Sequence, residues 1–269
     1  MADATPDRTD EAFWHEFLTR GDSNERKVRG LFRRLPRGPR CKLCAAPFEG
    51  AGAPLMRMLG KRRSEQNPKV CSSCFDFMLK HHGGAEIEVT LLFADIRGST
   101  AIAETISPVA FRNLLDRFYA AASVAVFDHD GSIDKFVGDE LMATFFPLLS
   151  GFEHVAKAIA AAESLLAATG HDDAAGPWVS LGAGIHTGIA WVGSVGDATH
   201  AELTAVGDVV NTAARIAAAA GAGEILVSAD AATAAGLGDG LERRQLELKG
   251  KQSLTEVVSL RLVAADRRR

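Results

Sequence analysis

Apolar and polar residues recur along this chain in two periods, one typical of β-strands and one typical of α-helices. Apolar or alternating runs predict strands at residues 87–94, 132–137, 141–146, 178–186, 189–195, 224–227, 241–248 and 255–262. Helical spacing predicts helices at 11–18, 75–82, 111–128, 153–169 and 208–220, with a shorter helix near Ala231. Because adjacent hairpins interrupt any strict βαβ repeat, the order favours an α+β fold with helices packed on a sheet.

Two aspartates occupy positions where predicted strands end or turn. Asp95 lies at the end of the apolar run 89–96, and Asp139 lies in the connection of the hairpin predicted at 132–146. A carboxylate at a strand end is costly unless it is solvated, paired or bound to a cation. Two such carboxylates brought together would repel each other, and a divalent metal resolves that conflict. The pair therefore indicates a two-metal phosphoryl-transfer site.

Both motifs also have an ordinary structural interpretation. The segment Gly98-Ser99-Thr100 can hold phosphate oxygens on free backbone N–H groups, or Ser99 or Thr100 can simply be a helix N-cap. Gly138-Asp139 is a common turn sequence, but Lys135 makes it more distinctive. In a regular strand Lys135 and Asp139 point to the same side, and a bulge at Gly138 would change that parity.

A third element combines an amide and a guanidinium on one helix. Asn211 and Arg215 are four residues apart in the predicted helix 208–220, so they share a face. The alternative is a surface pair on a helix packed through Val210, Ala214 and Ile216. Asparagine is a weak helix former, which favours a functional role for Asn211.

The four cysteines form two CxxC pairs, Cys41 with Cys44 and Cys71 with Cys74. This spacing predicts a zinc-ribbon-like module with four thiolates around one structural Zn²⁺. An iron–sulfur cluster is a less favoured alternative, and unligated thiols or a disulfide switch remain open. We expect His81 and His82 to be linker residues, because four thiolates already complete a tetrahedron.

Composition and charge narrow the possible location and partners of the protein only slightly. The chain has 269 residues, a net charge of −4 and no apolar run near the roughly 18–20 residues that span a bilayer. Its N-terminus is polar and acidic without a visible secretory signal, so we expect a cytoplasmic protein. Residues 20–42 contain nine Lys or Arg against two acidic residues, which suits weak contact with an acidic partner, nucleic acid or anionic lipid.

Together these motifs resemble the catalytic domain of class III nucleotidyl cyclases, the adenylate and guanylate cyclases. The resemblance covers about residues 86–262 and also includes GIHTG at 184–188 and LKGK at 248–251. It implies a cyclase-type sheet packed with helices around a ferredoxin-like core. The predicted organisation is a helix and basic segment at 1–40, a four-cysteine module at 41–74, a linker helix at 75–85, a catalytic domain at 86–263 and a basic tail at 264–269.

The resemblance implies roles for the residues of the three motifs. Asp95 and Asp139, with the Ile96 carbonyl, resemble the ligands of two Mg²⁺ or Mn²⁺ ions that act on ATP. Arg215 resembles the residue that stabilises the transition state, and Asn211 the one that orients the ribose.

Phosphate and base contacts follow from the same resemblance. Lys249 resembles the triphosphate-binding lysine, with Lys251 a less favoured substitute. Lys135 resembles the adenine-reading lysine, which suits the N1 acceptor of adenine and opposes the N1–H of guanine. Its partner position is Thr204, as in the bicarbonate-responsive subgroup, and a hydroxyl that both accepts and donates should discriminate bases less strictly.

The sequence thus predicts an adenylate cyclase that forms 3′,5′-cyclic AMP and pyrophosphate at a homodimer interface. Family members build each site from two catalytic domains, and this chain carries both sets of residues on one domain. The four-cysteine module is expected to regulate activity by setting dimer geometry. The alternatives are a guanylate or other nucleotide cyclase, or a metal- or redox-sensing interaction protein with a basic N-terminal segment.

Overall fold

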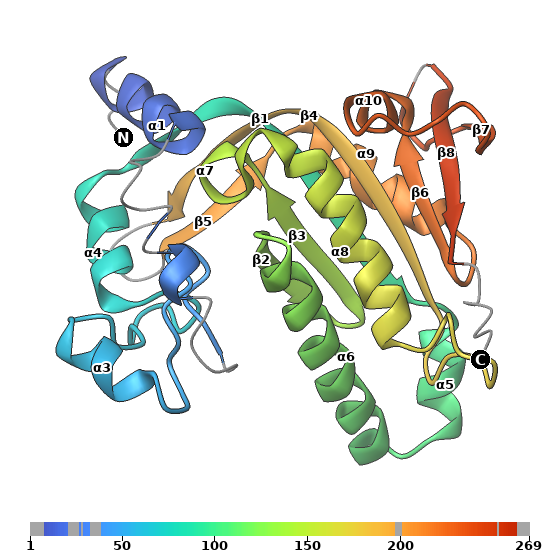
Figure 1. The fold of residues 1–269 in the computed structure, drawn as a ribbon, viewed down its shortest axis with the longest axis horizontal. Helices are drawn as coiled ribbons and strands as arrows, with labels where there is room; N and C mark the ends of the chain where they lie inside the picture. The colour runs from blue at the N-terminus through green and yellow to red at the C-terminus, as the bar shows by residue number, and fades with distance from the viewer. Residues whose placement is uncertain are drawn as a thin grey trace. The chain divides into compact units, whose positions relative to one another are not determined.

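The computed structural model describes residues 8–20, 27, 29–32, 39–196, 201–251 and 253–262, which form two compact units (Figure 1). The first unit comprises the described residues up to Ile87, with Pro147–Leu149 and Ile189–Gly207. The second comprises Glu88–Phe146, Ser150–Gly188 and the described residues from Asp208 onward. Much of the predicted basic stretch 20–42 and the whole tail 264–269 lie outside the described residues.

The second unit is built on a mixed sheet in the order β2-β3-β1-β4-β6-β8-β7. Parallel pairing joins β4 to β6, whereas β1 with β3, β2 with β3, β6 with β8 and β7 with β8 are antiparallel. The strand bounds are β1 Gly83–Ile96, β2 Ser132–Val137, β3 Glu140–Phe145, β4 Leu181–Gly196, β6 Glu224–Ser228, β7 Glu242–Leu246 and β8 Thr255–Arg261, with β1 and β4 contributing residues to both units.

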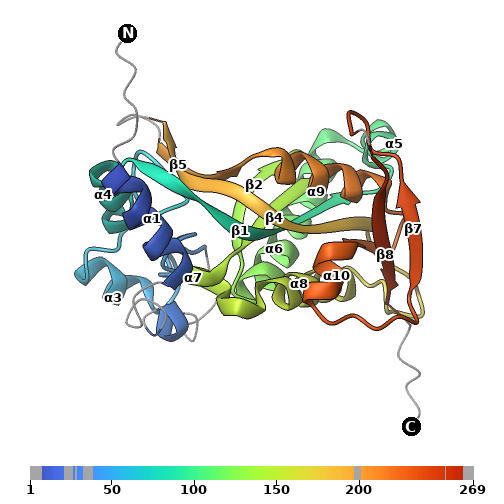
Figure 2. The same cartoon turned by 90° about the horizontal axis from the view of Figure 1, so that it is seen from above.

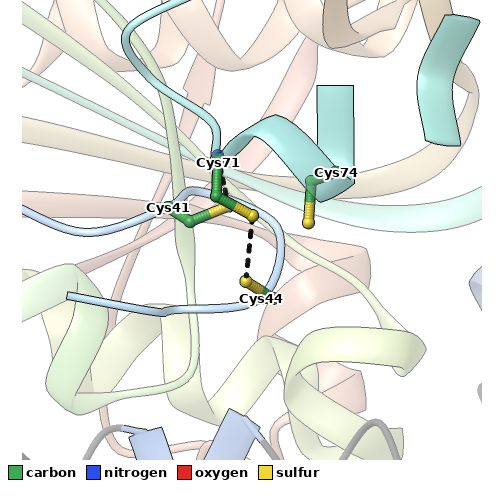
Figure 3. A group of neighbouring side chains, drawn as sticks. All are labelled: Cys41, Cys44, Cys71 and Cys74. Carbon is green, nitrogen blue, oxygen red and sulfur yellow. Dashed lines mark hydrogen bonds between the residues drawn. The ribbon is translucent and has the colours of Figure 1, made fainter. Parts of the chain in front are cut away.

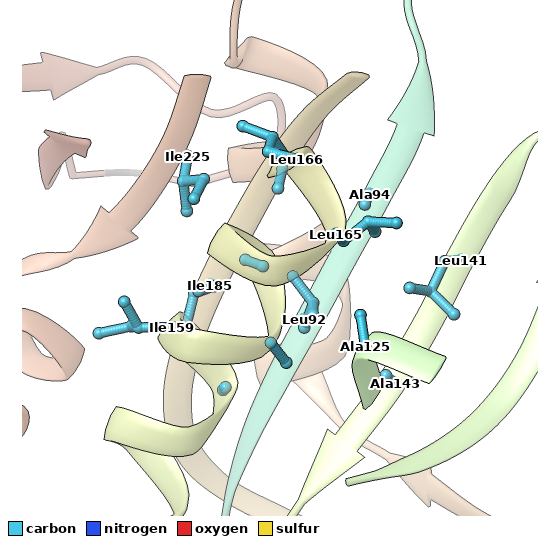
Figure 4. Close-up of a cluster of buried hydrophobic side chains, with 14 of the residues drawn as sticks. Leu92, Ala94, Ala125, Leu141, Ala143, Ile159, Leu165, Leu166, Ile185 and Ile225 are labelled. Carbon is cyan, nitrogen blue, oxygen red and sulfur yellow. The ribbon is translucent and has the colours of Figure 1, made fainter. Parts of the chain in front are cut away.

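Helices cover both faces of this sheet (Figure 2). One face buries an apolar core with α6 (Pro108–Asp128), α8 (His154–Ala168) and α10 (Ala229–Ala234), shown in Figure 4. The other face packs on α9 (Asp208–Ala219) through a smaller cluster that includes Ile216 and Leu226. Because successive strand side chains point to opposite faces, Ile225 and Val227 join the first core while Leu226 joins the second.

The first unit contains α1 (Arg8–Arg20), α3 (Ala53–Met58), α4 (Ser72–Lys80), β5 (Ala201–Val206) and all but the last residue of α7 (Pro147–Ser150). Aromatic packing joins α1 to α4: the Phe17 and Phe77 ring centroids lie 4.9 Å apart. The Trp14 ring lies edge-on to Phe77 and is fully buried. β5 pairs with the end of β4, and Lys69 forms a 2.7 Å ion pair with Glu202 of β5.

Most of the predicted helices and strands are confirmed, and the structure differs from the prediction in a few elements. Residues 178–186 and 189–195 were expected as two strands, but β4 is one continuous strand, Leu181–Gly196. Gly188 does not break it; a Cβ there would lie only 3.2 Å from Val209, so the glycine admits a close helix contact. β5 and α3 were not predicted, and the helix expected at 75–82, with its linker reaching 85, is α4, which ends at Lys80 before β1 begins at Gly83. Among the helices that the structure describes, none is both long and apolar enough to cross a bilayer.

Glu224 of β6 forms hydrogen bonds with residues of β7 and β8 and so links three strands of the sheet. Its buried carboxylate accepts hydrogen bonds from Gly221 N (2.7 Å), Arg244 (2.6 Å) and Ser259 Oγ (2.6 Å). Burial alone would raise the pKa of Glu224, but these hydrogen bonds outweigh it and lower that pKa. We expect Glu224→Gln to lower the free energy of unfolding in urea by about 2 kcal/mol at neutral pH, because charge-assisted bonds are lost.

The half-exposed pair of Glu256 with Arg243 (2.9 Å) supplies the control: Glu256→Gln should cost at most about 0.5 kcal/mol. A lowered folded-state pKa stabilises the fold above the unfolded pKa, and that contribution is lost as the pH falls. The difference between wild type and Glu224→Gln should therefore shrink in acid. Equal losses from both substitutions at neutral pH would contradict this role of Glu224.

Candidate active site and metal centre

The sheet brings the two predicted metal-binding aspartates together. Asp95 is the penultimate residue of β1, and its register partner on β3 is Glu140. Asp139 precedes Glu140 in the tight turn between β2 and β3. The sequence prediction that both carboxylates lie at strand ends is therefore confirmed, and the antiparallel pairing explains why they become neighbours.

The electrostatics of this corner favour a bound cation. Burial raises the pKa of Asp95; Arg97 opposes that shift, and the nearby Asp139 adds to it. The pKa of Glu140 is raised by burial first, and then by both aspartates. Asp95 Oδ1 is buried and forms no hydrogen bond, although Arg97 lies 2.8 Å away as a poorly aligned ion pair. Hard oxygen ligands with excess negative charge suit Mg²⁺ or Mn²⁺, so this donor set fits the predicted metals.

Residues 98–100 begin a short helix, α5 (Ser99–Thr105). Its N-cap is Gly98 in the left-handed conformation (φ 74°), and no side chain caps the helix. The alternative that Ser99 or Thr100 is the N-cap is therefore wrong. The first N–H groups of α5 have no side-chain cap, as the phosphate interpretation requires.

Arg97 connects the aspartate corner to α9, a link that sequence reasoning missed. Its guanidinium donates to the carbonyls of Ala217 and Ala218 in the last turn of α9, where helix carbonyls need partners. Gly182 makes room for it, because a Cβ there would clash with the Arg97 guanidinium. Arg97 therefore fixes the end of β1 against α9.

The turn that carries Asp139 is held from α6. Tyr119, the single tyrosine of the chain, stacks on Phe136 with ring centroids 4.0 Å apart and donates its hydroxyl hydrogen bond to Gly138 O. Lys135 is half-buried on β2, 3.9 Å from Asp134 Oδ1. The pairing of β2 with β3 is irregular between Ile133 and Lys135, so the bulge lies before Lys135 and not at Gly138. Sequence reasoning gave Tyr119 no role.

Asn211 and Arg215 lie on α9 as predicted. Asn211 is exposed and Arg215 half-buried, while the packed face consists of Val209, Thr212, Ala213, Ile216 and Ala217. Of the packing residues named in the alternative interpretation, Ile216 is fully buried, whereas Val210 and Ala214 are only half-buried. A Cβ on Gly250 would lie 3.7 Å from the Arg215 guanidinium, which places the loop carrying exposed Lys249 beside that arginine.

Lys251 has a partner of its own. Its Nζ binds the Asp208 carboxylate at the start of α9. That hydrogen bond is the main cause of the lowered pKa of Asp208, and Arg215 contributes as well. Lys249 forms no ion pair among the described residues, which keeps it the better candidate for phosphate contact.

Charged residues of the second unit fall into two groups. The predicted Asp95 and Asp139 interact electrostatically with each other and with Glu140, which was not predicted, and the predicted Arg215 lies with Gly250 and Asp208. Within the described ranges no hydrogen bond or ion pair joins the first three residues to Arg215 or Lys249. Thr204 belongs to the first unit, on β5 opposite Gly193.

The four cysteines form a compact cluster in the first unit (Figure 3). Their Sγ atoms lie within 4.8 Å of one another, and Cys44 Sγ is 3.8 Å from Cys71 Sγ. Tetrahedral zinc with Zn–S bonds of about 2.3 Å separates its sulfurs by about 3.8 Å. The cluster is therefore consistent with a zinc-binding module, and the expectation that His81 is not a ligand agrees with its stacking on Phe13.

The ionisation of the thiols also points to a cation. Burial raises the pKa of Cys41, but hydrogen bonds from the other three cysteines lower it well below its usual value. The pKa of Cys74 is raised well above its usual value, mainly by its hydrogen bond with Cys41. Neighbouring thiolates repel one another, so all four thiols can ionise together only when a positive ion neutralises them.

Known proteins share this fold and part of this sequence. The chain is 37% identical over 144 residues to adenylate cyclase 1 of Rhizobium meliloti, and 34% identical over 134 residues to an adenylate cyclase of Anabaena cylindrica. These matches cover 51% and 48% of this chain, but only 22% and 26% of those proteins. The chain thus matches only a minor part of each relative.

Solved structures show the same architecture. The guanylyl cyclase Cya2 superposes with a TM-score of 0.60 at 25% identity, covering 66% of this chain and 93% of that one. The adenylyl cyclase CyaB from P. aeruginosa superposes with a TM-score of 0.57 at 28% identity, and the match covers 65% of this chain and 93% of that one. The model of the adenylate and guanylate cyclase catalytic domain matches residues 84–259, most of the chain. The chain therefore belongs to the class III adenylate and guanylate cyclase family.

Proposed function

We propose that this protein is an adenylate cyclase that converts ATP to 3′,5′-cyclic AMP and pyrophosphate at the interface of a homodimer. The observation that carries this proposal is the proximity of Asp95 to Asp139, where the buried Oδ1 of Asp95 forms no hydrogen bond. Similarity to adenylate cyclases from two organisms supports the reaction class.

The aspartate corner holds the metals in this proposal. Asp95, Asp139 and the Ile96 carbonyl hold a pair of Mg²⁺ or Mn²⁺ ions, and the fit rests on their excess negative charge. When bound, these ions activate the ribose 3′-hydroxyl and neutralise the triphosphate. The uncapped start of α5, at Gly98, Ser99 and Thr100, contributes backbone N–H groups toward the phosphates.

Residues of α9 and the loop at 249–250 act on the phosphates and the ribose. Arg215 stabilises charge that develops on the α-phosphoryl group, and Lys249 binds the triphosphate. Asn211 orients the ribose so that its 3′-oxygen lies in line with the bond to be broken. These residues and the aspartates fall into two groups in one chain, which agrees with a site completed by a second copy.

Base choice rests on Lys135 and Thr204. The Lys135 ammonium can donate to N1 of adenine, whereas the N1–H of guanine would face it as a second donor. The Thr204 hydroxyl can accept from the 6-amino group of adenine, but it can also donate to an oxygen. We therefore expect ATP to be preferred with looser discrimination than a carboxylate would give.

A direct product assay tests this assignment. Purified full-length protein is incubated with each ribonucleoside triphosphate and Mn²⁺ or Mg²⁺, and the products are separated by chromatography. We expect cyclic AMP from ATP, and a shift toward cyclic GMP in Lys135→Glu, because an acidic residue can accept from guanine N1–H. Cyclic GMP as the main wild-type product would favour the guanylate cyclase alternative, which the similarity to Cya2 also supports.

Mixing inactive variants tests the shared site. Asp139→Ala and Arg215→Ala should each be inactive, but a mixture should recover up to about a quarter of wild-type activity, because half the dimers keep one complete site. Asp95→Ala mixed with Asp139→Ala is the control and should stay inactive, because both changes fall on the same set. If the mixture of Asp139→Ala and Arg215→Ala stays inactive although heterodimers are shown to form, the site is not shared between two copies of the chain.

We also propose that the four-cysteine cluster binds one structural Zn²⁺ and controls activity through dimer geometry. Cys71→Ser should lose zinc and change both the cyclase rate and the dimer fraction, since it removes one of four ligands. Leu55→Ser, an exposed change on α3 of the same module, is the control. Metal analysis and sedimentation measure the outcome; zinc loss without any change in rate or dimerisation would contradict the regulatory role.

A further inference from the structure

A cavity of about 290 Å³ lies in the first unit, beside the cysteine cluster. Its apolar wall includes Phe17 of α1, Phe77 of α4, and Leu148 with Leu149 of α7. An enclosed apolar cavity of about 150 Å³ is enough to hold benzene, so this one can hold a molecule of about two fused rings.

The cavity adjoins the accessible side of the cluster. Cys44 and Cys74 both line it. Cys44 is the one half-exposed member of the cluster, whereas the other three cysteines are buried. A molecule in the cavity would therefore contact the cysteine of the cluster that is most open to solvent.

Charge decides what kind of molecule fits. Four thiolates around Zn²⁺ carry a formal charge of about −2. Two cationic side chains, Arg29 and Lys61, also line the cavity, and Arg29 Nη1 donates to Leu43 O at 2.5 Å within the first CxxC pair. The two cations thus balance the loaded cluster, which leaves no net charge for an ionic ligand.

We propose that this cavity binds a small uncharged apolar molecule, about the size of two fused rings, in contact with Cys44. The proposal rests on zinc occupancy of the four-cysteine cluster. Such an occupant displaces water from the Cys44 sulfur, and protons or a chelating agent then reach that ligand less often. Metal retention and cavity occupancy are therefore linked, since anything that binds the loaded state stabilises it.

The test uses zinc-loaded full-length protein and indole as the uncharged two-ring probe. Calorimetry measures its binding, with indole-3-carboxylate and tryptamine as probes of the same ring system carrying opposite charges. We expect indole to bind more tightly than either ion. We also expect it to slow zinc transfer to a chromophoric chelator several-fold, because the occupied cavity shields Cys44.

Two variants locate the binding site. Leu149→Trp fills the cavity and should weaken indole binding at least about tenfold. Leu55→Trp adds the same side chain on exposed α3 and should leave binding unchanged. If Leu149→Trp fails to fold, methyl NMR of the wild type replaces it, and indole should shift the signals of Leu148 and Leu149 but not of Leu55.

Each outcome separates the cavity proposal from the proposed function. Zinc content and cyclic nucleotide formation are measured on the same preparation. A zinc-loaded, active protein that does not bind indole, or that prefers the carboxylate, overturns the cavity proposal alone. Unchanged binding in folded Leu149→Trp also overturns it, whereas a protein without zinc refutes the zinc assignment.

Discussion

The enforced proximity of Asp95 and Asp139 is the constraint on which the catalytic unit depends. Hydrogen-bonded pairing of β1 with β3 sets Asp95 opposite Glu140, so the preceding Asp139 cannot move away without breaking the ladder. Burial and mutual repulsion then raise the pKa of Asp95. A divalent cation would relieve this repulsion, and the cyclase family to which the chain belongs uses two metal ions.

Other parts of the fold hold this corner in place. Arg97 ties the end of β1 to the C-terminus of α9, the helix that carries Asn211 and Arg215. Tyr119 holds the turn of Asp139 from α6. The corner with Asp95 and Asp139, and the helix that carries Asn211 and Arg215, are thus each fixed to the same sheet. In the proposed dimer, a rigid unit of this kind lets subunit geometry decide whether a complete site forms.

Much of the candidate site could be predicted from the sequence because its signals are local. Asp95 and Asp139 stand out by their place at strand ends, and Asn211 and Arg215 by helical spacing. The contacts of Arg97 with Ala217 and of Tyr119 with Gly138 were missed, because they join segments far apart in the sequence. β5 was missed although Leu203 and Ala205 alternate with polar neighbours, because this short alternation runs almost directly into α9.

Mn²⁺ binding measures metal occupancy of the aspartate corner most directly. Electron paramagnetic resonance of the full-length protein, with a non-cyclisable ATP analogue, reports how much Mn²⁺ is bound and whether the ions are coupled. We expect a coupled pair in the wild type and its loss in Asp95→Asn and in Asp139→Asn, because each change removes a charged ligand. Folded variants that bind coupled Mn²⁺ as the wild type does would contradict this expectation.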